Sequence, residues 1–314
     1  MCRILSIEIS LSDMIFEPHF FSFADDPISN IYMHVERTRL ELISRWKGVR
    51  TKIIGPCYSY NNIDIYPLPR ILFGVTQGNI DRNYSLYKIG PGNHAESDLG
   101  SKVLPVIANG SIPRFRNHGV VLRGWITKRG LQELSDYQLP DLKEIFFAED
   151  FFPPVMSGRK GQPSFGGLKV LYYVIAKELS VKEILKELKK EKKYKARICN
   201  NIKGRFDFGG GEGSLQKGFF ISLMTPMLTN NVKDILLNGP AELPFACISA
   251  STSKPLKVLF GNQERKVFLI PEGSTWFYQF RDDAKMMDIL RKIKRRGVGR
   301  QTSYGYGKCL IAPS

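Results

Sequence analysis

Apolar runs of strand length occur in clusters along this chain, and single segments of helix length separate the clusters. The runs alternate with period two or are continuously apolar, and Gly, Pro and Asn residues bound them. Clustered strands with single helices between them are typical of an α+β fold, whereas a doubly wound fold would alternate strands and helices regularly. The strands are predicted at residues 1–11, 51–73, 170–180, the later part of 204–227, 244–251, 265–280 and 308–312.

Amphipathic segments between these runs predict helices. Residues 31–46 and 283–296 have helical apolar spacing, a short helix is expected after the capping residue Thr127, and the clearest helix is expected over 180–197. The helix at 283–296 ends in cations, which complement the negative end of a helix dipole, and Gly297 is placed to terminate it.

The length of 314 residues favours two domains of ordinary size. We expect an N-terminal domain over 1–200 and a C-terminal domain over 201–314. Residues 74–116 are rich in Gly, Asn, Ser and Pro and show little periodicity, so a long irregular insertion is expected there.

The net charge is strongly positive, because 46 Lys and Arg residues stand against 30 Asp and Glu residues. The resulting charge of +16 attracts polyanions, and nucleic acid phosphates are the commonest partner of such a field. The alternative is a basic protein from an organism whose proteins are generally rich in Lys. No apolar run is long enough for a membrane span and the N-terminus lacks a signal-peptide pattern, so we expect a cytoplasmic protein without membrane contact.

The sequence offers no metal or cofactor signature. The five cysteines are scattered and form no CxxC pair, so neither a zinc site nor a disulfide framework is indicated. The adjacent carboxylates Asp282 and Asp283 are more simply explained as helix-capping residues than as metal ligands. We therefore expect neither a metal nor a cofactor.

A glycine-rich segment, RRGVGRQTSYGYGKCLI (295–311), lies between the last predicted helix and the last predicted strand. A dinucleotide-binding fingerprint needs a strand before the glycines and a helix after them, and a P-loop needs Ser or Thr after its Lys; this segment meets neither requirement. Glycines allow backbone N–H groups to converge on a phosphate, while Tyr304 and Tyr306 could stack on bases. The segment therefore suggests a single-stranded nucleic acid site, the alternative being a connector whose tyrosines pack inward.

The segment GVGRQTSYGYGK (297–308) resembles the glycine-rich loop that is the hallmark of the RAMP superfamily of CRISPR-associated proteins. Within that superfamily the chain most resembles the third subunit of the Cmr (type III-B) effector complex. Five further segments carry this likeness: IIGPCYSYNNIDIYPLP (53–69), GWITKRGLQEL (124–134), GRKGQPSFGGLKVLYYV (158–174), GGGEGS (209–214) and IPEGSTWFYQF (270–280).

The resemblance implies a particular fold and function. It implies two ferredoxin-like (RRM-like) domains with insertions, the glycine-rich loop lying before the last strand. It implies an RNA-binding ribonucleoprotein subunit for antiviral defence in the cytoplasm of a prokaryote, in particular an archaeon. Such a subunit grips the 5′ repeat-derived tag of the CRISPR RNA (crRNA) and meets target RNA only indirectly. Its expected neighbours are the large polymerase-like subunit and the first backbone RAMP subunit.

The RNA contacts are expected around the glycine loop, from the last turn of the preceding helix and from one loop of the other domain. We expect contacts from Lys294, Arg295, Arg296, Gly297, Gly299, Arg300, Gln301, Thr302, Ser303, Tyr304, Gly305, Gly307, Lys308, Arg159 and Lys160. At the Gly209–Ser214 turn, Ser214 stands where the family often has an arginine, which puts a phosphate role there in doubt.

Two alternatives remain open. Some RAMP relatives cut CRISPR precursor RNA without a metal, using a histidine near the first helix as general acid and base, and His34 is the candidate here. The equivalent subunit of the Csm (type III-A) complex shares the implied fold and role. A lone helical histidine is more often structural, so we expect a binding subunit and not an enzyme.

Overall fold

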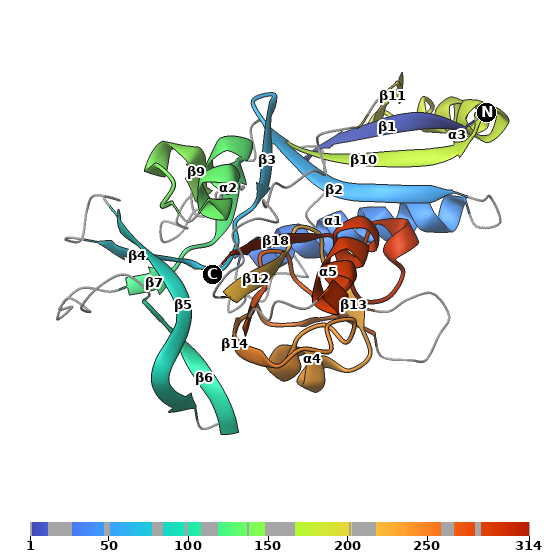
Figure 1. Ribbon diagram of the computed structural model, residues 1–314. Helices are drawn as coiled ribbons and strands as arrows, with labels where there is room; N and C mark the ends of the chain where they lie inside the picture. Colours follow the sequence, from blue (N-terminus) through green and yellow to red (C-terminus); the bar gives the residue numbers. More distant parts are fainter. Residues whose placement is uncertain are drawn as a thin grey trace.

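The computed structural model describes most of the chain. The described residues are 2–11, 27–46, 51–76, 84–97, 100–107, 119–136, 138–147, 167–200, 202, 218–258, 267–279 and 284–313. They form antiparallel sheets with helices packed against them, which confirms the α+β class (Figure 1). None of the described helices is long and apolar enough to cross a membrane.

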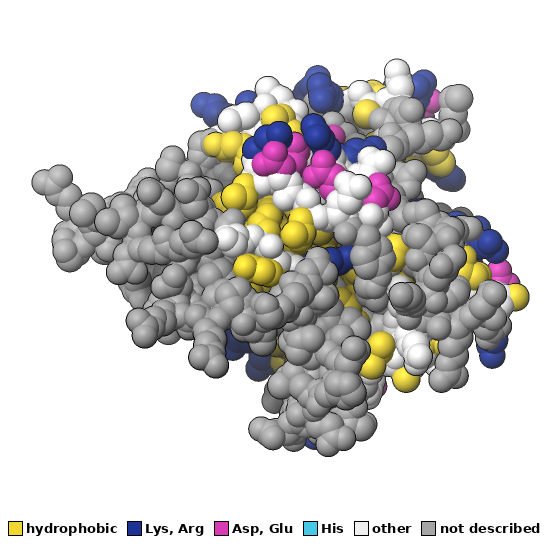
Figure 2. Space-filling view, turned by 60° about the vertical axis from the view of Figure 1, so that its left-hand side comes forward, with side chains coloured by type: hydrophobic (Ala, Val, Ile, Leu, Met, Phe, Trp, Pro, Cys, Tyr) yellow, Lys and Arg dark blue, Asp and Glu magenta, His cyan; other side chains and the backbone are white. Residues whose placement is uncertain are grey.

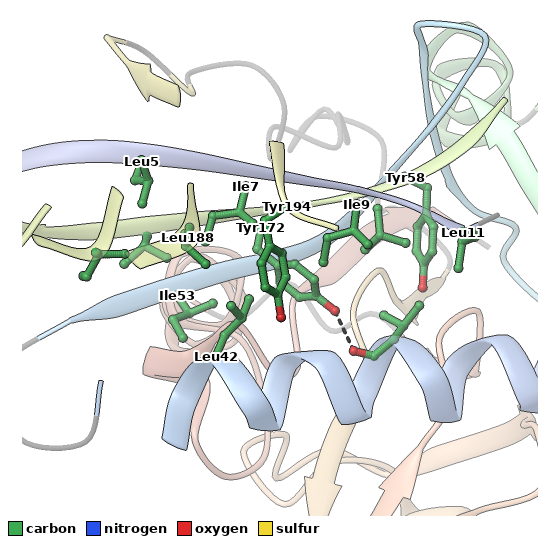
Figure 3. Packing of buried hydrophobic residues seen from close by; sticks show 14 of the residues in the cluster. Leu5, Ile7, Ile9, Leu11, Leu42, Ile53, Tyr58, Tyr172, Leu188 and Tyr194 are labelled. Atoms are coloured by element: carbon green, nitrogen blue, oxygen red, sulfur yellow. Dashed lines mark hydrogen bonds between the residues drawn. The ribbon is translucent and has the colours of Figure 1, made fainter. Parts of the chain in front are cut away.

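A seven-stranded antiparallel sheet organises the first two thirds of the described chain. Its spatial order is β11 (Lys195–Cys199), β1 (Cys2–Ser10), β10 (Leu168–Lys177), β2 (Lys52–Tyr60), β3 (Ile63–Pro67), β8 (Gly124–Thr127) and β9 (Ile145–Phe147). Two helices, α1 (Pro27–Arg45) and α3 (Glu178–Leu188), bury their apolar stripes against one face of the sheet (Figure 3). The strand pairs all run antiparallel, with Cys2 opposite Lys177 and Ile4 opposite Cys199.

A four-stranded sheet organises the last third. Its order is β14 (Cys247–Ser251), β17 (Thr275–Gln279), β12 (Gly218–Leu223) and β18 (Cys309–Pro313). Alternate residues of β12 face α4 (Val232–Asn238) and α5 (Ala284–Arg296), in a core built around Trp276. Four strands and two helices of this C-terminal unit follow one another along the chain as β12-α4-β14-β17-α5-β18, a β-α-β-β-α-β unit. In the seven-stranded sheet, β1-α1-β2-β10-α3-β11 form a second such unit. In both large sheets the four strands of such a unit take the order fourth, first, third, second, the connectivity of ferredoxin-like units.

Two smaller sheets complete the described structure. One contains β13 (Met227–Thr229), β16 (Val267–Ile270) and β15 (Leu256–Val258). The other contains β6 (Gly100–Ile107), β5 (Tyr84–Ser97), β4 (Leu72–Thr76) and β7 (Gly119–Val121). Figure 1 shows β5 and β6 as two long neighbouring strands beside β14.

The two large sheets share an apolar core. The face of the C-terminal sheet opposite α5 contributes Phe220, Phe277 and Leu310, which cluster with Leu68 and with Leu131 of α2 (Lys128–Ser135). Strand β12 is therefore buried on both faces, which explains its continuous apolar sequence. The predicted boundary at residue 200 stays a prediction.

Several sequence predictions are confirmed. The helix predicted over 31–46 is α1, that over 283–296 is α5, and Thr127 caps α2 by accepting a hydrogen bond from the Gly130 amide at 3.1 Å.

Three predictions need correction. The region 74–116 is not irregular throughout, because β5 and β6 lie within it as a paired ladder whose register shifts between Pro91 and Glu96. A ladder is held by backbone hydrogen bonds and tolerates Gly and Pro at such irregularities.

The helix predicted over 180–197 ends at Leu188, since no apolar side chain continues its buried stripe. Strand β11 follows it and pairs with β1. The single strand predicted over 265–280 is two strands in different sheets, separated by a turn at Gly273 with φ +77°. Helix α4 and strand β15 were not predicted.

Candidate functional site: the glycine segment and the junction beneath it

The glycine segment begins where α5 ends. Gly297 adopts φ +86° and its amide donates to the Ile293 carbonyl at 2.7 Å, so it terminates the helix as predicted. Lys294, Arg295 and Arg296 in the last turn are exposed. Three cations thus stand at the negative end of the helix dipole.

The tip of the segment, residues 300–303, carries its exposed polar side chains. The Arg300 amide donates to the Leu228 carbonyl at 3.1 Å, which fixes where the tip leaves the body of the protein. Gln301 adopts a left-handed φ of +58° before a short 3₁₀ turn over Thr302–Tyr304. The side chains of Arg300, Gln301 and Ser303 are exposed, whereas Thr302 is half-buried.

The base of the segment, residues 304–308, is packed into the protein. Gly305, Tyr306 and Gly307 are buried, and Tyr304 and Lys308 are half-buried. The Tyr306 ring is 0% exposed, so the prediction that it offers a stacking face to a base is wrong for this structure. The alternative that a tyrosine packs inward describes Tyr306.

Most amides of the segment already have partners inside the protein. The amides of Gly297, Val298, Arg300, Tyr304, Gly305 and Gly307 donate to backbone carbonyls, that of Gly299 to the Glu242 carboxylate, and that of Lys308 to the Thr225 hydroxyl. The amides of Gln301, Thr302 and Ser303 at the tip do not belong to this group. The interpretation that the glycine amides converge on a phosphate therefore does not fit this conformation.

The glycines instead permit close backbone packing. A Cβ on Gly305, which has φ +88°, would lie 2.7 Å from the Gly55 carbonyl oxygen and 3.1 Å from that of Ile53 in β2. A Cβ on Gly307 would overlap the Val298 carbonyl. Strand β2 pairs with β3 only from Tyr58 onward. The loop therefore lies along the part of β2 that pairs with no described strand on that side.

Tyr306 reaches a buried group of charged residues on the other side of this contact. Its hydroxyl donates to the Glu36 carboxylate, and the Arg39 guanidinium lies 4.1 Å from the centre of its ring. Arg39 and Glu36 are 0% and 2% exposed, with 3.6 Å between Nε and Oε2. Glu272, from the turn before β17, is also buried and interacts electrostatically with Arg39. We call Glu36, Arg39, Tyr306 and Glu272 the junction cluster.

Burial dominates the acid–base behaviour of the junction cluster. Loss of solvation raises the pKa of Glu272 to about 8, with the Tyr58 hydroxyl and Arg39 opposing the shift. Burial likewise raises the pKa of Glu36, against the effects of Arg39 and Tyr306. Burial alone would lower the pKa of Arg39, but Glu36 together with Tyr306, Tyr172 and Glu272 outweighs burial and raises that pKa, so Arg39 stays cationic.

Lys308 links the base of the loop to the end of α5. Its ammonium donates to the Arg295 carbonyl at 2.8 Å and so satisfies one of the last carbonyls of that helix. Burial lowers the pKa of Lys308, and the positive charge of Lys52 at the start of β2 lowers it further.

The charge on the face of the molecule drawn in Figure 2 is mixed. Figure 2 shows Lys and Arg side chains beside Asp and Glu side chains there. The exposed pairs Arg129–Glu133 at 3.0 Å and Lys143–Asp141 at 2.7 Å are of this kind. In the described part of the chain, Arg295, Arg296 and Arg300 have no carboxylate partner, which distinguishes the end of α5 and the tip from such paired surfaces.

The sequence analysis did not identify Glu36, Arg39 and Glu272 of the junction cluster, or Lys52. One signal was present: Arg39 lies on the apolar stripe Ile31–Val35–Leu42 of α1, four residues after Val35 and three before Leu42. A charge inside an apolar stripe indicates a buried, paired ion. Arg159, Lys160 and Gly209–Ser214 lie outside the described residues, as does the side chain of His34.

Comparisons with known proteins identify no family. No family model and no curated protein matches the chain. One similar solved structure is described as the Csm3-Csm4 subcomplex in the type III-A CRISPR-Cas interference complex, with 12% identity, coverage of 99% of both chains and a TM-score of 0.32. Another is the type III-B Cmr-beta complex bound to cognate target RNA and AMPPnP, with 11% identity, coverage of 98% of this chain and 95% of that chain, and a TM-score of 0.31. Likenesses of this size establish neither fold nor function.

Proposed function

We propose that this chain is a non-catalytic crRNA-binding subunit of a type III CRISPR effector complex, of the III-B (Cmr) kind. The order of the RAMP-like segments along the sequence supports this proposal, as do the net charge of +16 and two β-α-β-β-α-β units, which we interpret as two ferredoxin-like domains. The 5′ repeat-derived tag of the crRNA is the proposed ligand. The large polymerase-like subunit and the first backbone RAMP subunit are the proposed neighbours.

The observation that carries the proposal is that one segment has both an exposed tip with cations and a base that is buried in the protein. Arg300 and the three cations that end α5 stand in solvent, while Tyr306 and Gly305 fix the loop against the other half of the protein. Cations held on a fixed support lose little conformational freedom when they bind, which favours affinity. Arg295, Arg296 and Arg300, which have no carboxylate partner in the described part of the chain, can neutralise RNA phosphates. Gln301 and Ser303 can donate hydrogen bonds.

A binding measurement with the matching RNA tests the proposal. We would follow a fluorescently labelled RNA with the repeat-derived 5′ tag by anisotropy, from low to high salt, with the wild-type protein and an Arg295→Ala/Arg296→Ala variant. We expect binding that weakens with salt, and a variant slope of log Kd against log salt smaller by roughly 1.4, from about 0.7 for each single-strand phosphate contact. Lys233→Ala on α4, another exposed lysine, should leave the slope unchanged.

Two results would contradict the proposal. Absence of salt-dependent RNA binding would remove the binding role, and discrete cleavage of a repeat RNA that disappears in His34→Ala would replace it with a nuclease. Purification from the native host with its bound RNA and partner proteins would distinguish the III-B from the III-A complex.

A further inference from the structure

The seam between the glycine loop and β2 brings a lysine of the N-terminal half beside the loop. Gly305 packs directly on the backbone of β2 at Ile53, the residue that follows Lys52. Lys308 lies three residues after Gly305, at the other end of the same buried base. The fold thus places Lys52 and Lys308 on either side of one contact between the two halves.

The two lysines interact electrostatically. Lys52 is exposed and contributes to lowering the pKa of Lys308, so the two ammonium groups are near enough to repel one another. Lys308 cannot swing away without losing its hydrogen bond to the Arg295 carbonyl at 2.8 Å. Arg295 itself is exposed.

No carboxylate offsets this concentration of charge in the described part of the chain. Neither Lys52 nor Lys308 makes an ion pair with any described Asp or Glu side chain. By contrast, the exposed cations Arg129 and Lys143 are each paired with a carboxylate. Like charges that lie near one another are unfavourable until an anion binds between them.

We propose that Lys52 and Lys308 form a phosphate-binding subsite at the seam, so that an RNA backbone bound at the loop tip continues across the seam onto the N-terminal half. The ligand is a phosphodiester of single-stranded RNA, and the inference rests on the proposed function. Lys52 lies outside the glycine segment and is the binding residue that this proposal adds. The Arg295 carbonyl holds the ammonium group of Lys308 in this subsite.

The salt dependence of RNA binding tests the subsite. We would compare wild type with Lys52→Ala, with the charge-conserving Lys52→Arg, and with Lys233→Ala as a matched loss of one exposed lysine elsewhere. One lost single-strand phosphate contact lowers the slope of log Kd against log salt by about 0.7, a roughly fivefold weaker affinity at 0.1 M salt. We expect this loss of slope and affinity for Lys52→Ala, and wild-type behaviour for Lys52→Arg and Lys233→Ala. If RNA binds and Lys52→Ala behaves like Lys233→Ala, the subsite is overturned while the proposed function stands.

A second probe works without RNA. With isotope-labelled lysines, the ε-ammonium resonance of Lys308 should shift as inorganic pyrophosphate is added to the wild type, and this saturable shift should be lost in Lys52→Ala. If the wild type binds no RNA, the proposed function fails, and the pyrophosphate shift alone then supports the subsite. Absence of the shift in the wild type, or its persistence unchanged in Lys52→Ala, would overturn the subsite.

Discussion

The tip and the base of the glycine segment use similar residues in opposite ways. At the tip, Arg300 is exposed and has no described acidic partner; beneath the base, Arg39 is fully buried and packs against Tyr306 and Glu36. A run of glycines beside positive charge therefore has two separate explanations here. The glycines serve close backbone packing, Gly305 against β2 and Gly307 within the segment itself, and the exposed cations are what a ligand can reach.

This difference shows which substitutions should affect folding and which should affect binding. Charges in the junction cluster are desolvated, so their loss should destabilise the protein. Charges at the tip are solvated, so their loss should leave stability unchanged and alter only interactions with anions.

The largest expected effect is at Arg39. Arg39→Met would leave Glu36 and Glu272 buried without their cation, and removing one partner of a buried ion pair costs about 3–5 kcal/mol of unfolding free energy. Arg45→Met, on the same helix but with an exposed guanidinium paired to Glu41 and Glu191, should cost under about 1 kcal/mol. Urea unfolding of both variants checks the contrast. Equal losses would mean that the junction cluster does not stabilise the fold.

A smaller loss is expected at Gly307. Gly307→Ala would force a side chain into a left-handed conformation and against the Val298 carbonyl, at a cost of about 1–3 kcal/mol or more. Ser303→Ala at the exposed tip should change the unfolding free energy by less than about 0.5 kcal/mol. Thermal denaturation measures both. A Gly307→Ala protein as stable as wild type would show that the base can open, and would restore its amide as a candidate RNA contact.

The junction cluster should also make stability depend on pH. The folded-state pKa of Glu272, about 8, lies above its ordinary value of 4.5, so the folded state holds the proton more tightly. The stabilisation from this proton is complete below pH 4.5 and is lost as pH rises through 8. The contribution changes by at most about 1.4 kcal/mol per pH unit. Unfolding measured from pH 5 to 8 should show this decline, and Glu272→Gln should flatten it; an unchanged slope in the variant would remove Glu272 as its source.

The smallest effect on stability, and a clear one on binding, is expected at Arg300. Arg300→Ala should leave the urea midpoint within error of wild type. It should lower the salt slope of RNA binding by about 0.7 to 1, as expected for one lost phosphate contact. An unchanged slope would remove Arg300 from the interface, and a large loss of stability would contradict the distinction between tip and base.

The sequence predicted the individual helices and strands better than it predicted which strands pair with one another. The apolar stripe of α1, the Thr127 cap and the cationic end of α5 are local patterns, and each was readable from neighbouring residues. The pairing of β1 with both β10 and β11 joins residues far apart in the chain, which no local pattern encodes. The ladder of β5 and β6 was missed because it depends on backbone pairing more than on composition.

For the site, the sequence located the glycine segment and its exposed cations. It did not distinguish Tyr304 from Tyr306, because burial depends on what packs against each ring. The charged residues that contact Tyr306 come from α1, and its apolar neighbours include Leu228 and Leu269 from other strands. Glu272 lies within a segment that resembled a family motif, but its interaction with Arg39 spans more than 200 residues of sequence. Contacts of that range become visible only in the folded chain.

The position of β1 has a consequence for the order of events during synthesis. This strand lies between β10 and β11, so about 160 residues must be made after it before its first neighbour exists. At ribosomal speeds of about 5–20 residues per second, β1 waits roughly 10–30 s with both edges open. The later β-α-β-β-α-β unit, over 218–313, finds all its neighbours within a span of fewer than a hundred residues. Newly made chains are therefore most exposed to misassociation early, through β1, and a chaperone that shields this strand should raise the yield of folded protein.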